Sequence, residues 1–337
     1  MDYPAISIII PTLNSDQTLK NCLESILKQD YPREKLEIII SDGGSTDNTF
    51  NTVKESSQAM NINLVYNELK TGEAGKAQGL KCAQHDIIAF IDSDNILPQE
   101  DWLKRMTEPF CDLDIIATEP LYYTYRRTDG YITRYCALLG MNDPLCLFLG
   151  NYDRYCLLTN KWTEMAIKET ERDSYIEVNF LNAWLPTIGA NGFFIRKEEL
   201  LKYSIKDYLF DIDIVQSLYL NNQTLKIAKV KVGIIHIFSQ TFCDFISKQN
   251  RRFRDYVYYK MRGLRTYQWL RIPKFRVFKF ILYTLLFIPV FIQAIRGYLV
   301  KRDRAWFFHP VACWVTLYIY SILFLRNIIR PLQPKRR

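Results

Sequence analysis

Histidine is scarce in this chain of 337 residues, which has three histidines and none paired at metal-ligand spacing. Its eight cysteines are scattered and include no C-x-x-C pair. A zinc site built from His and Cys is therefore not expected, and we interpret the cysteines as reduced core residues of a cytosolic domain. The N-terminus has no basic segment followed by an apolar one, so we expect no signal peptide.

Acidic residues are almost missing from the last part of the chain. Residues 248–337 hold 20 Lys/Arg and 2 Asp/Glu, whereas residues 1–247 hold 24 and 34. The basic part also contains two uncharged runs, 280–295 with 16 residues, broken by Pro289, and 305–325 with 21. Because a membrane crossing needs about 20 apolar residues, the second run is long enough and the first is borderline. The pattern predicts attachment to a membrane, and it favours a bilayer over nucleic acid as the anionic partner.

The topology of these segments stays open at this point. Basic residues lie on both outer flanks and in the linker 296–304. Two simple spans would place positive charge on both sides of the membrane, against the usual bias toward the inner side. Shallow or re-entrant helices in the interface are therefore an alternative to two spans.

The first hundred residues alternate between short apolar runs and segments with helical spacing. We predict strands over 6–10, 37–40, 63–66 and 87–91, and helices over 18–29, 48–57 and 75–83. Continuous apolar strands separated by helices predict a parallel sheet covered on both faces. The first, second and fourth strands end in polar turns, which should share the ligand-binding rim at the carboxyl ends of the strands. In residues 100–185 the apolar residues show little of the periodicity expected for helices or strands.

Two carboxylates, Asp92 and Asp94, follow the strand over 87–91 and are separated by Ser93. Mg²⁺ and Mn²⁺ prefer oxygen ligands and often bind through one or two carboxylates plus substrate phosphates. The spacing therefore indicates a metal and diphosphate site. In the alternative interpretation, Asp94 caps a helix that begins near Pro98 and Asp92 is solvated.

Two further motifs stand near the same rim. Asp42 ends the second strand, where its carboxylate could accept a hydrogen bond from a nucleotide base, with Gly43 beside it. The alternative is an Asx turn with Thr46 or Asp47 as the helix N-cap. Lys76, near a helix N-terminus, could contact phosphate or be a solvated lysine.

Four ordered motifs resemble the family 2 glycosyltransferases: Ser7–Asn14 (SIIIPTLN), Ile40–Thr49 (ISDGGSTDNT), Gly75–Gly79 (GKAQG) and Phe90–Asp94 (FIDSD). The resemblance implies a GT-A fold, an α/β, Rossmann-like architecture with a mixed, mostly parallel sheet flanked by helices. It further implies that Asp42 recognises the base, that Pro11 and Thr12 line its pocket, and that Asp92 and Asp94 form the motif for Mg²⁺ or Mn²⁺. From the same motifs we include Asn14, Gly43, Lys76 and Ser93 among the expected nucleotide-sugar contacts. The chain departs from the family at Ser15, where many members have an acidic residue.

The resemblance is weaker in the second half. Family members usually have an acidic pair whose Asp deprotonates the acceptor hydroxyl. The candidates here are Asp211 and then Asp213, with Phe210 in place of the usual Glu, and the alternative is that both lie on the exposed start of a helix.

Two basic or titratable residues complete the expected site. His236 ends an apolar strand and is expected near the metal or diphosphate, or as a core or capping histidine. Gln249–Phe253 (QNRRF) resembles the Q-x-x-R-W signature of processive members, so Arg252 is expected either to bind phosphate or to face the membrane.

Together these features predict a GT-A-like domain over 1–235, a basic amphipathic neck over 236–275 and membrane-anchoring helices over 276–337. The expected activity is that of a metal-dependent hexosyltransferase. It would transfer sugar with inversion from a UDP- or GDP-sugar to a hydroxyl or phosphate of a lipid-linked or saccharide acceptor. The catalytic domain would lie at the cytoplasmic face of the membrane, with no nucleic acid partner.

Two rival functions are considered. A nucleotidyltransferase would typically carry a glycine-rich loop near the N-terminus, and Ile8–Asn14 has no glycine. A non-catalytic membrane protein that binds a nucleotide-sugar or a partner is favoured by the loss of the Glu before Asp211.

Overall fold

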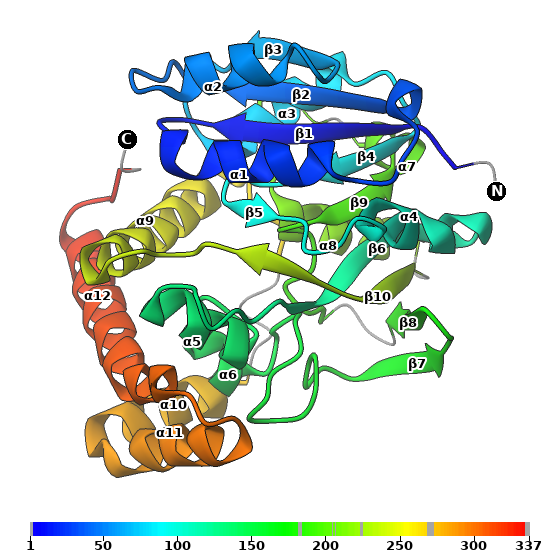
Figure 1. The fold of residues 1–337 in the computed structure, drawn as a ribbon. Coiled ribbons are helices and arrows are strands. Elements are labelled where there is room, and N and C mark those ends of the chain that lie inside the picture. The colour runs from blue at the N-terminus through cyan, green and yellow to red at the C-terminus, as the bar shows by residue number, and fades with distance from the viewer. Residues whose placement is uncertain are drawn as a thin grey trace.

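A computed structural model describes residues 3–180, 184–203, 205, 207–222, 225–267 and 273–333. An α/β domain carries a group of C-terminal helices along one side (Figure 1). Residues 268–272 of the predicted neck and 334–337 of the predicted anchor lie outside the described residues.

The centre of the fold is a 10-stranded mixed sheet in the order β3-β2-β1-β4-β9-β6-β10-β8-β7, with β5 paired to β10. β1 runs parallel to β2 and β4, β2 runs parallel to β3, and β9 is antiparallel to β4 and β6. The predicted mixed α/β fold is confirmed. The strands are β1 (Ile6–Thr12), β2 (Leu36–Asp42), β3 (Ile62–Tyr66), β4 (Ile87–Phe90), β5 (Asn95–Ile96), β6 (Ile115–Tyr123), β7 (Ile167–Glu171), β8 (Tyr175–Phe180), β9 (Phe193–Arg196) and β10 (Lys226–His236).

The described residues form helices on both faces of this sheet and a further group of helices toward the C-terminal end. They are α1 (Asp16–Leu27), α2 (Thr49–Ser56), α3 (Gly72–Cys82), α4 (Trp102–Thr107), α5 (Tyr131–Leu139), α6 (Leu145–Leu149), α7 (Lys197–Leu201), α8 (Asp211–Asn222), α9 (Phe242–Met261), α10 (Lys274–Leu286), α11 (Ile288–Val300) and α12 (His309–Ile329). α1 and α4 pack on one face and α3, α7 and α8 on the other. The four strands and three helices predicted in the first hundred residues are confirmed as β1 to β4 and α1 to α3, with ends shifted by a few residues.

Alternate residues of β1 enter opposite cores. Ile8 and Ile10 pack in the cluster that contains α1, whereas Ile9 packs with Ala77 and Leu80 of α3. Because successive side chains of a strand point to opposite faces, a strand buried on both sides needs a continuous apolar run. β-Branched isoleucine fills that run well, which explains why Ile6–Ile10 reads so clearly as a strand.

A third core lies below the sheet and joins the middle of the chain to its C-terminal end. α5 and α6 contribute residues such as Tyr135 and Phe148, and Trp306, Ala312 and Cys313 come from the C-terminal segment. The region 100–185, which shows few periods in the sequence, supplies β6, α5, α6 and the β7–β8 pair. These elements are short, and their core is completed by residues more than 150 positions away.

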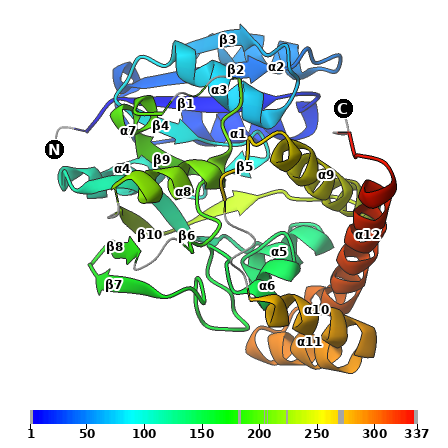
Figure 2. The same cartoon turned by 180° about the vertical axis from the view of Figure 1, so that it is seen from behind.

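The C-terminal helices differ in length and in straightness. α12 runs along one side of the molecule, next to α9 at one end and to α10 and α11 at the other (Figures 1 and 2). The helical segment Arg304–Ile329 is long and apolar enough to cross a membrane. α10 and α11 would add a second span only if the pair, which is bent by 90°, counted as one.

Candidate active site

A cavity of about 630 Å³ lies between the carboxyl ends of the strands β1 and β4 and the helix α9. Nine residues predicted for the site line it: Pro11, Thr12, Lys76, Asp92, Ser93, Asp94, Asp211, His236 and Arg252. These residues come from separate segments of the chain, and the fold brings them to one rim. Asn14, Asp42, Gly43 and Asp213 lie outside the set of described residues that line the cavity.

Lys76 joins two of the predicted carboxylates. Its Nζ lies 2.7 Å from Asp211 Oδ2 and 3.2 Å from Asp92 Oδ1. Only 4% of Lys76 is exposed, so the solvated alternative is wrong for this lysine. Asp211 Oδ1 is buried and accepts no hydrogen bond from any described residue. Asp211 lines the cavity and its side chain is 19% exposed, so its carboxylate is a suitable acceptor for a substrate proton.

The ionisation of these groups follows from their surroundings. Burial raises the pKa of Asp211 above that of an ordinary carboxyl, and Asp92 adds to this, while Lys76 opposes it. Burial alone would lower the pKa of Lys76, but the charges of Asp211 and Asp92 outweigh burial and raise it. Lys76 is therefore a permanent cation that holds Asp211 in place.

Two glycines of α3 let Lys76 reach this position. A Cβ on Gly75 would lie 2.8 Å from Pro11 Cβ, and one on Gly79 would overlap Ile9 Cγ2. The helix therefore packs directly on β1, with Thr71 as its N-cap, accepting from Ala74 N at 3.1 Å. The Gly75–Gly79 motif thus has a packing role, and its contact with phosphate stays a prediction.

This packing predicts unequal effects for two glycine substitutions in one helix. Gly79→Ala is expected to leave the protein about 1–3 kcal/mol less stable than Gly72→Ala, because the added methyl overpacks the core against Ile9. Gly72 is the first residue of α3, and no described atom lies within 4 Å of its would-be Cβ, so Gly72→Ala adds a methyl group without overpacking. Urea unfolding of the two variants measures the difference, and equal stabilities would contradict the close packing.

Asp94 lies beside two basic side chains. Its Oδ1 is 3.4 Å from His236 Nε2 and its Oδ2 is 3.3 Å from Lys248 Nζ. Burial disfavours the charged carboxylate, but His236 and Lys248 outweigh burial and hold the pKa of Asp94 well below its usual range. The helix after Pro98 begins at Trp102 with Asp101 as its N-cap, so Asp94 is not its cap. Asp94 therefore stays ionised at any physiological pH.

Asp94 and His236 carry donor atoms of the types that bind a divalent cation. Among the described residues, no group of three His, Cys, Asp or Glu side chains converges on one point. Mg²⁺ and Mn²⁺ commonly use only one or two protein carboxylates and take their other ligands from phosphate and water. The 3.4 Å between Asp94 Oδ1 and His236 Nε2 suits two neighbouring ligands of one ion. Asp94 and His236 would hold the metal, with Asp92 nearby.

The loop after β2 forms the layer behind the cavity wall. Asp42 Oδ2 accepts from Thr12 Oγ1 at 2.8 Å, and Asp42 Oδ1 accepts from the backbone N–H groups of Gly44 and Ser45 at 2.8 and 2.7 Å. The Asx turn considered for Asp42 is therefore present. Asn48 is the N-cap of α2, in place of Thr46 or Asp47. Asp42 orients Thr12, which does line the cavity.

Asn14 and Ser15 fix the first polar turn. Asn14 has a positive φ of 50°, and its Oδ1 accepts from Thr46 N at 2.9 Å. Ser93 Oγ donates to Ser15 Oγ at 3.1 Å. Ser15, which replaces the acidic residue of many relatives, therefore joins the first turn to the Asp92–Asp94 turn.

Asp213 points away from the cavity although it lies only two residues after Asp211. Its Oδ2 lies 2.7 Å from Arg265, and its Oδ1 accepts from Tyr267 N at 2.9 Å. On one helix, residues two apart do not face the same way. The geometry therefore separates the two candidates for the base and brings only Asp211 to the cavity.

Helix α9 covers the cavity with basic side chains. Lys248, Arg251 and Arg252 all line it. Arg252 Nη1 donates to Gln249 Oε1 at 3.0 Å and lies 3.6 Å from Asp143, so it faces the site and not the membrane. Lys248 was not predicted, because a single lysine in a basic region gives no signal of its partner Asp94.

A buried network of ion pairs joins β6, β10 and Arg154, and the sequence analysis does not predict it. Glu119 Oε2 lies 2.7 Å from Arg154 Nη1 and 2.6 Å from Lys229 Nζ, and all three side chains are fully buried. Glu119 Oε1 accepts from Gly189 N at 2.9 Å, and Arg154 Nη2 donates to Ala190 O at 2.8 Å. The network holds the turn that contacts Asp211, because a Cβ on Gly189 would lie 2.5 Å from Asp211 O.

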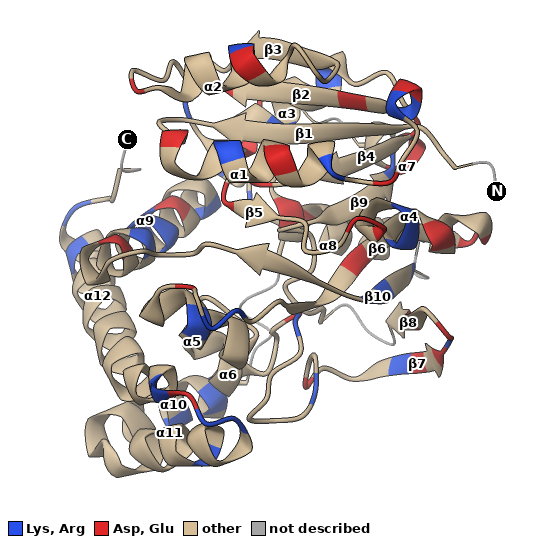
Figure 3. Ribbon diagram, viewed as in Figure 1, with Lys and Arg blue, Asp and Glu red and all other residues tan. Residues whose placement is uncertain are grey.

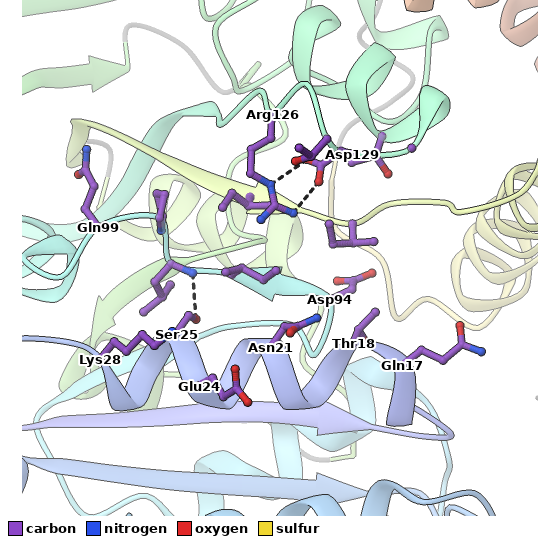
Figure 4. A pocket seen from close by; sticks show the side chains of 18 of the residues that line it. Gln17, Thr18, Asn21, Glu24, Ser25, Lys28, Asp94, Gln99, Arg126 and Asp129 are labelled. Atoms are coloured by element: carbon purple, nitrogen blue, oxygen red, sulfur yellow. Dashed lines mark hydrogen bonds and ion pairs between the residues drawn. The ribbon is translucent and has the colours of Figure 1, made fainter.

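A second cavity, of about 800 Å³, lies on the α1 side of Asp94. Gln17, Thr18, Asn21 and Glu24 of α1 form one wall, and the loop with Arg126 and Asp129 forms another (Figure 4). Arg126 Nη2 donates to Asp129 Oδ1 at 2.6 Å, so these two charges satisfy each other. Asp94 lines both cavities.

Comparison with known proteins identifies the class of protein. The family described as Glycosyl transferase family 2 matches residues 7–175, and the chain belongs to this family. The mannosyltransferase PcManGT from Pyrobaculum calidifontis, solved in complex with GDP-Man and Mn²⁺, shares the fold over 95% of this chain and 88% of its own, with a TM-score of 0.56 and 16% identity.

Two curated relatives align with shorter segments. The Dolichyl N-acetyl-alpha-D-glucosaminyl phosphate 3-beta-D-2,3-diacetamido-2,3-dideoxy-beta-D-glucuronosyltransferase of Methanococcus voltae is 37% identical over 108 residues, which is 31% of this chain and 33% of that protein. The UDP-Glc:alpha-D-GlcNAc-diphosphoundecaprenol beta-1,3-glucosyltransferase WfgD of Escherichia coli is 40% identical over 97 residues. These are 28% of this chain and 37% of that protein. The chain thus aligns with only about a third of each relative's length.

Proposed function

We propose that this protein transfers a sugar from a UDP- or GDP-sugar to a hydroxyl of a lipid-linked acceptor at the cytoplasmic face of the membrane, with inversion at the anomeric carbon. The observation that supports this most strongly is the presence in one cavity of the Asp211 carboxylate, held by Lys76, together with the Asp94–His236 pair. A base and a diphosphate site in one cavity are what a direct displacement requires.

In this proposal Asp211 accepts the proton of the acceptor hydroxyl. The hydroxyl oxygen attacks the anomeric carbon, and the bond from that carbon to the diphosphate oxygen breaks, so the nucleoside diphosphate leaves with the electron pair. A single displacement inverts the configuration. Lys76 orients the Asp211 carboxylate through its 2.7 Å contact, and the turn at Gly189 supports it from behind.

The donor would lie between the β1 and β4 turns and α9. Pro11 and Thr12 would contact the nucleotide, and Lys248, Arg251 and Arg252 would face the diphosphate. Asp94 and His236 would hold Mg²⁺ or Mn²⁺, which when bound offsets the negative charge on the leaving diphosphate.

Lipid-linked acceptors are supported by the names of the two relatives, which specify a dolichyl phosphate sugar and a diphosphoundecaprenol sugar. The non-catalytic alternative rests on Phe210 in place of Glu. The Phe210 ring centroid lies 4.9 Å from that of Tyr259, which lines the cavity, and 4.7 Å from the Arg265 guanidinium, so Phe210 packs behind the cavity wall while Asp211 lines the cavity. We therefore favour the enzyme.

The test is donor turnover by membranes that carry the wild type or Asp94→Ala. We expect one UDP- or GDP-sugar to be turned over in the presence of Mg²⁺ or Mn²⁺, and the variant to lose roughly a hundredfold or more, because the metal site contributes several kcal/mol to the transition state. Asp30→Ala, at a carboxylate that is 73% exposed, is the matched control and should keep full activity. Donor binding without turnover would favour the non-catalytic alternative, and no binding to any donor would refute the proposal.

A further inference from the structure

The C-terminal helices expose a broad apolar surface. At the bend between α10 and α11, Leu286 is 56% exposed and Ile288 is 67% exposed. Phe287, Phe291, Trp314 and Tyr318 are also exposed and extend this surface along α11 and α12. We call these six residues and their helices the C-terminal apolar face. Figures 1 and 2 show α12 on the side of the molecule opposite to α4 and α7.

The charges around this face have one sign. Lys274, Lys279, Arg296, Arg302 and Arg304 are exposed at its edges. The acidic residue Asp303 is almost buried, because it binds Arg134 and Tyr125. Figure 3 shows α12 with hardly any charged residues between its basic ends. An apolar surface bordered by lysine and arginine complements the interface of a bilayer that contains anionic lipid.

α10 and α11 are too short to cross a bilayer. Each has 13 residues and is therefore about 20 Å long, against about 30 Å of hydrocarbon. The pair is bent by 90°, with Phe287 at a positive φ of 61°. Gly297 brings α11 into contact with the indole of Trp306, which ties the pair to the start of α12.

α12 is long enough to cross, but it is attached to the catalytic domain along its length. Near its start, His309 Nδ1 lies 2.8 Å from Tyr135 Oη, and farther along Tyr320 Oη donates to Asp143 Oδ2 at 2.6 Å. Ile319 and Leu323 pack in one cluster with Phe253 of α9. α9 also carries the cavity residues Lys248, Arg251 and Arg252. A membrane-crossing α12 would draw these charges into hydrocarbon, which is costly.

We propose that the C-terminal apolar face rests in one leaflet of an anionic bilayer, so that the protein is monotopic and α12 lies along the surface without crossing. The inference rests on the membrane location in the proposed function and adds the depth and the topology. Because α9 separates α12 from the cavity, the active site lies one helix layer from the lipid.

The first test is flotation of the full chain with vesicles of phosphatidylcholine, with and without phosphatidylglycerol. The wild type should float, more strongly with the anionic lipid and less so at high salt. Leu286→Asp combined with Ile288→Asp should lower the vesicle partition coefficient by about tenfold or more, because two apolar side chains are no longer buried in lipid. Leu113→Asp combined with Leu201→Asp is the matched control, since these leucines are 82% and 64% exposed and lie outside the C-terminal helices.

The second test is protease protection of a C-terminal epitope in sealed membrane vesicles of known orientation. We expect the epitope and the catalytic domain on the same side, whereas opposite sides would refute the monotopic arrangement. Failure of the wild type to float would also refute it. A dimer in solution that the Leu286/Ile288 variant turns into a monomer would instead assign the face to a second copy of the chain. Neither readout needs turnover, so the inference can fail or hold independently of the enzymatic activity.

Discussion

Asp211→Asn is expected to lower the turnover number by about 10²–10⁴-fold, the contribution typical of a positioned general base. The amide cannot accept the proton of the acceptor hydroxyl, but it keeps the size of the carboxyl and a hydrogen-bond acceptor for Lys76. Affinity for the donor nucleotide should therefore stay close to that of the wild type. Steady-state kinetics and nucleotide titration measure the two effects separately.

The turnover number of the wild type is also expected to depend on pH. The base must be unprotonated, so turnover falls as the pH falls through the pKa of Asp211. Burial raises this pKa, so the fall is expected at a higher pH than for an ordinary exposed carboxyl. The residual activity of Asp211→Asn should lack this acidic limb.

Asp213→Asn is the matched control, two residues along the same helix. Asp213 binds Arg265 and the backbone of Tyr267, so its loss should lower stability and leave turnover per folded molecule near the wild-type value. A large loss of turnover in Asp213→Asn together with an active Asp211→Asn would exchange the roles that we assign to the two residues.

Glu119→Gln is expected to lower the free energy of unfolding by about 3–5 kcal/mol, the usual effect of removing one partner from a buried ion pair. Glu119 compensates both Arg154 and Lys229, and none of the three side chains is exposed. Without Glu119, Asp153 still pairs with Arg154 Nη1, but two buried cations then share that one carboxylate. Chemical unfolding measures the loss.

Asp114→Asn provides the comparison, because Asp114 pairs with Lys226 at the surface, where 69% of the Asp114 side chain is exposed. This change should cost less than about 1 kcal/mol. The deficit of Glu119→Gln should shrink as the pH rises from neutral toward about 8. Burial lowers the pKa of Lys229 to about 8 and the charge of Glu119 opposes this, so without Glu119 the folded protein gives up the Lys229 proton at a lower pH than the wild type does. A deficit below about 1 kcal/mol would show that the network tolerates the loss of the Glu119 charge.

The N-terminal half of the fold is predictable from the sequence because its signals are local. The runs Ile6–Ile10 and Ile87–Ile91 are each buried on both faces, and the polar turns after them must share one rim in a parallel sheet. The rim residues Thr12, Asp92 and Asp94 therefore follow from the local pattern. Lys76 was placed in the right region, but its pairing with Asp211 joins positions 135 residues apart, and no local pattern shows such a contact.

The second half is harder to predict for the same physical reason. Asp211 and Asp213 look equivalent in sequence, and only the rotation of α8 separates them. Arg252 and Lys248 belong to a basic region whose facing direction depends on how α9 packs between the cavity and α12. Glu119, Arg154 and Lys229 lie in three distant segments, so their network has no signature in any of them.

The third core cluster has a practical consequence for preparing a water-soluble form of this protein. Trp306, Ala312 and Cys313 pack with Tyr135 and Phe148 of the catalytic domain, so the C-terminal helices are part of its interior. Cutting the chain before α10 would uncover that interior and yield an aggregating fragment. Polar substitutions at the α10–α11 bend remove exposed apolar side chains and leave the third core cluster intact. They are therefore the better route to crystals and to solution assays.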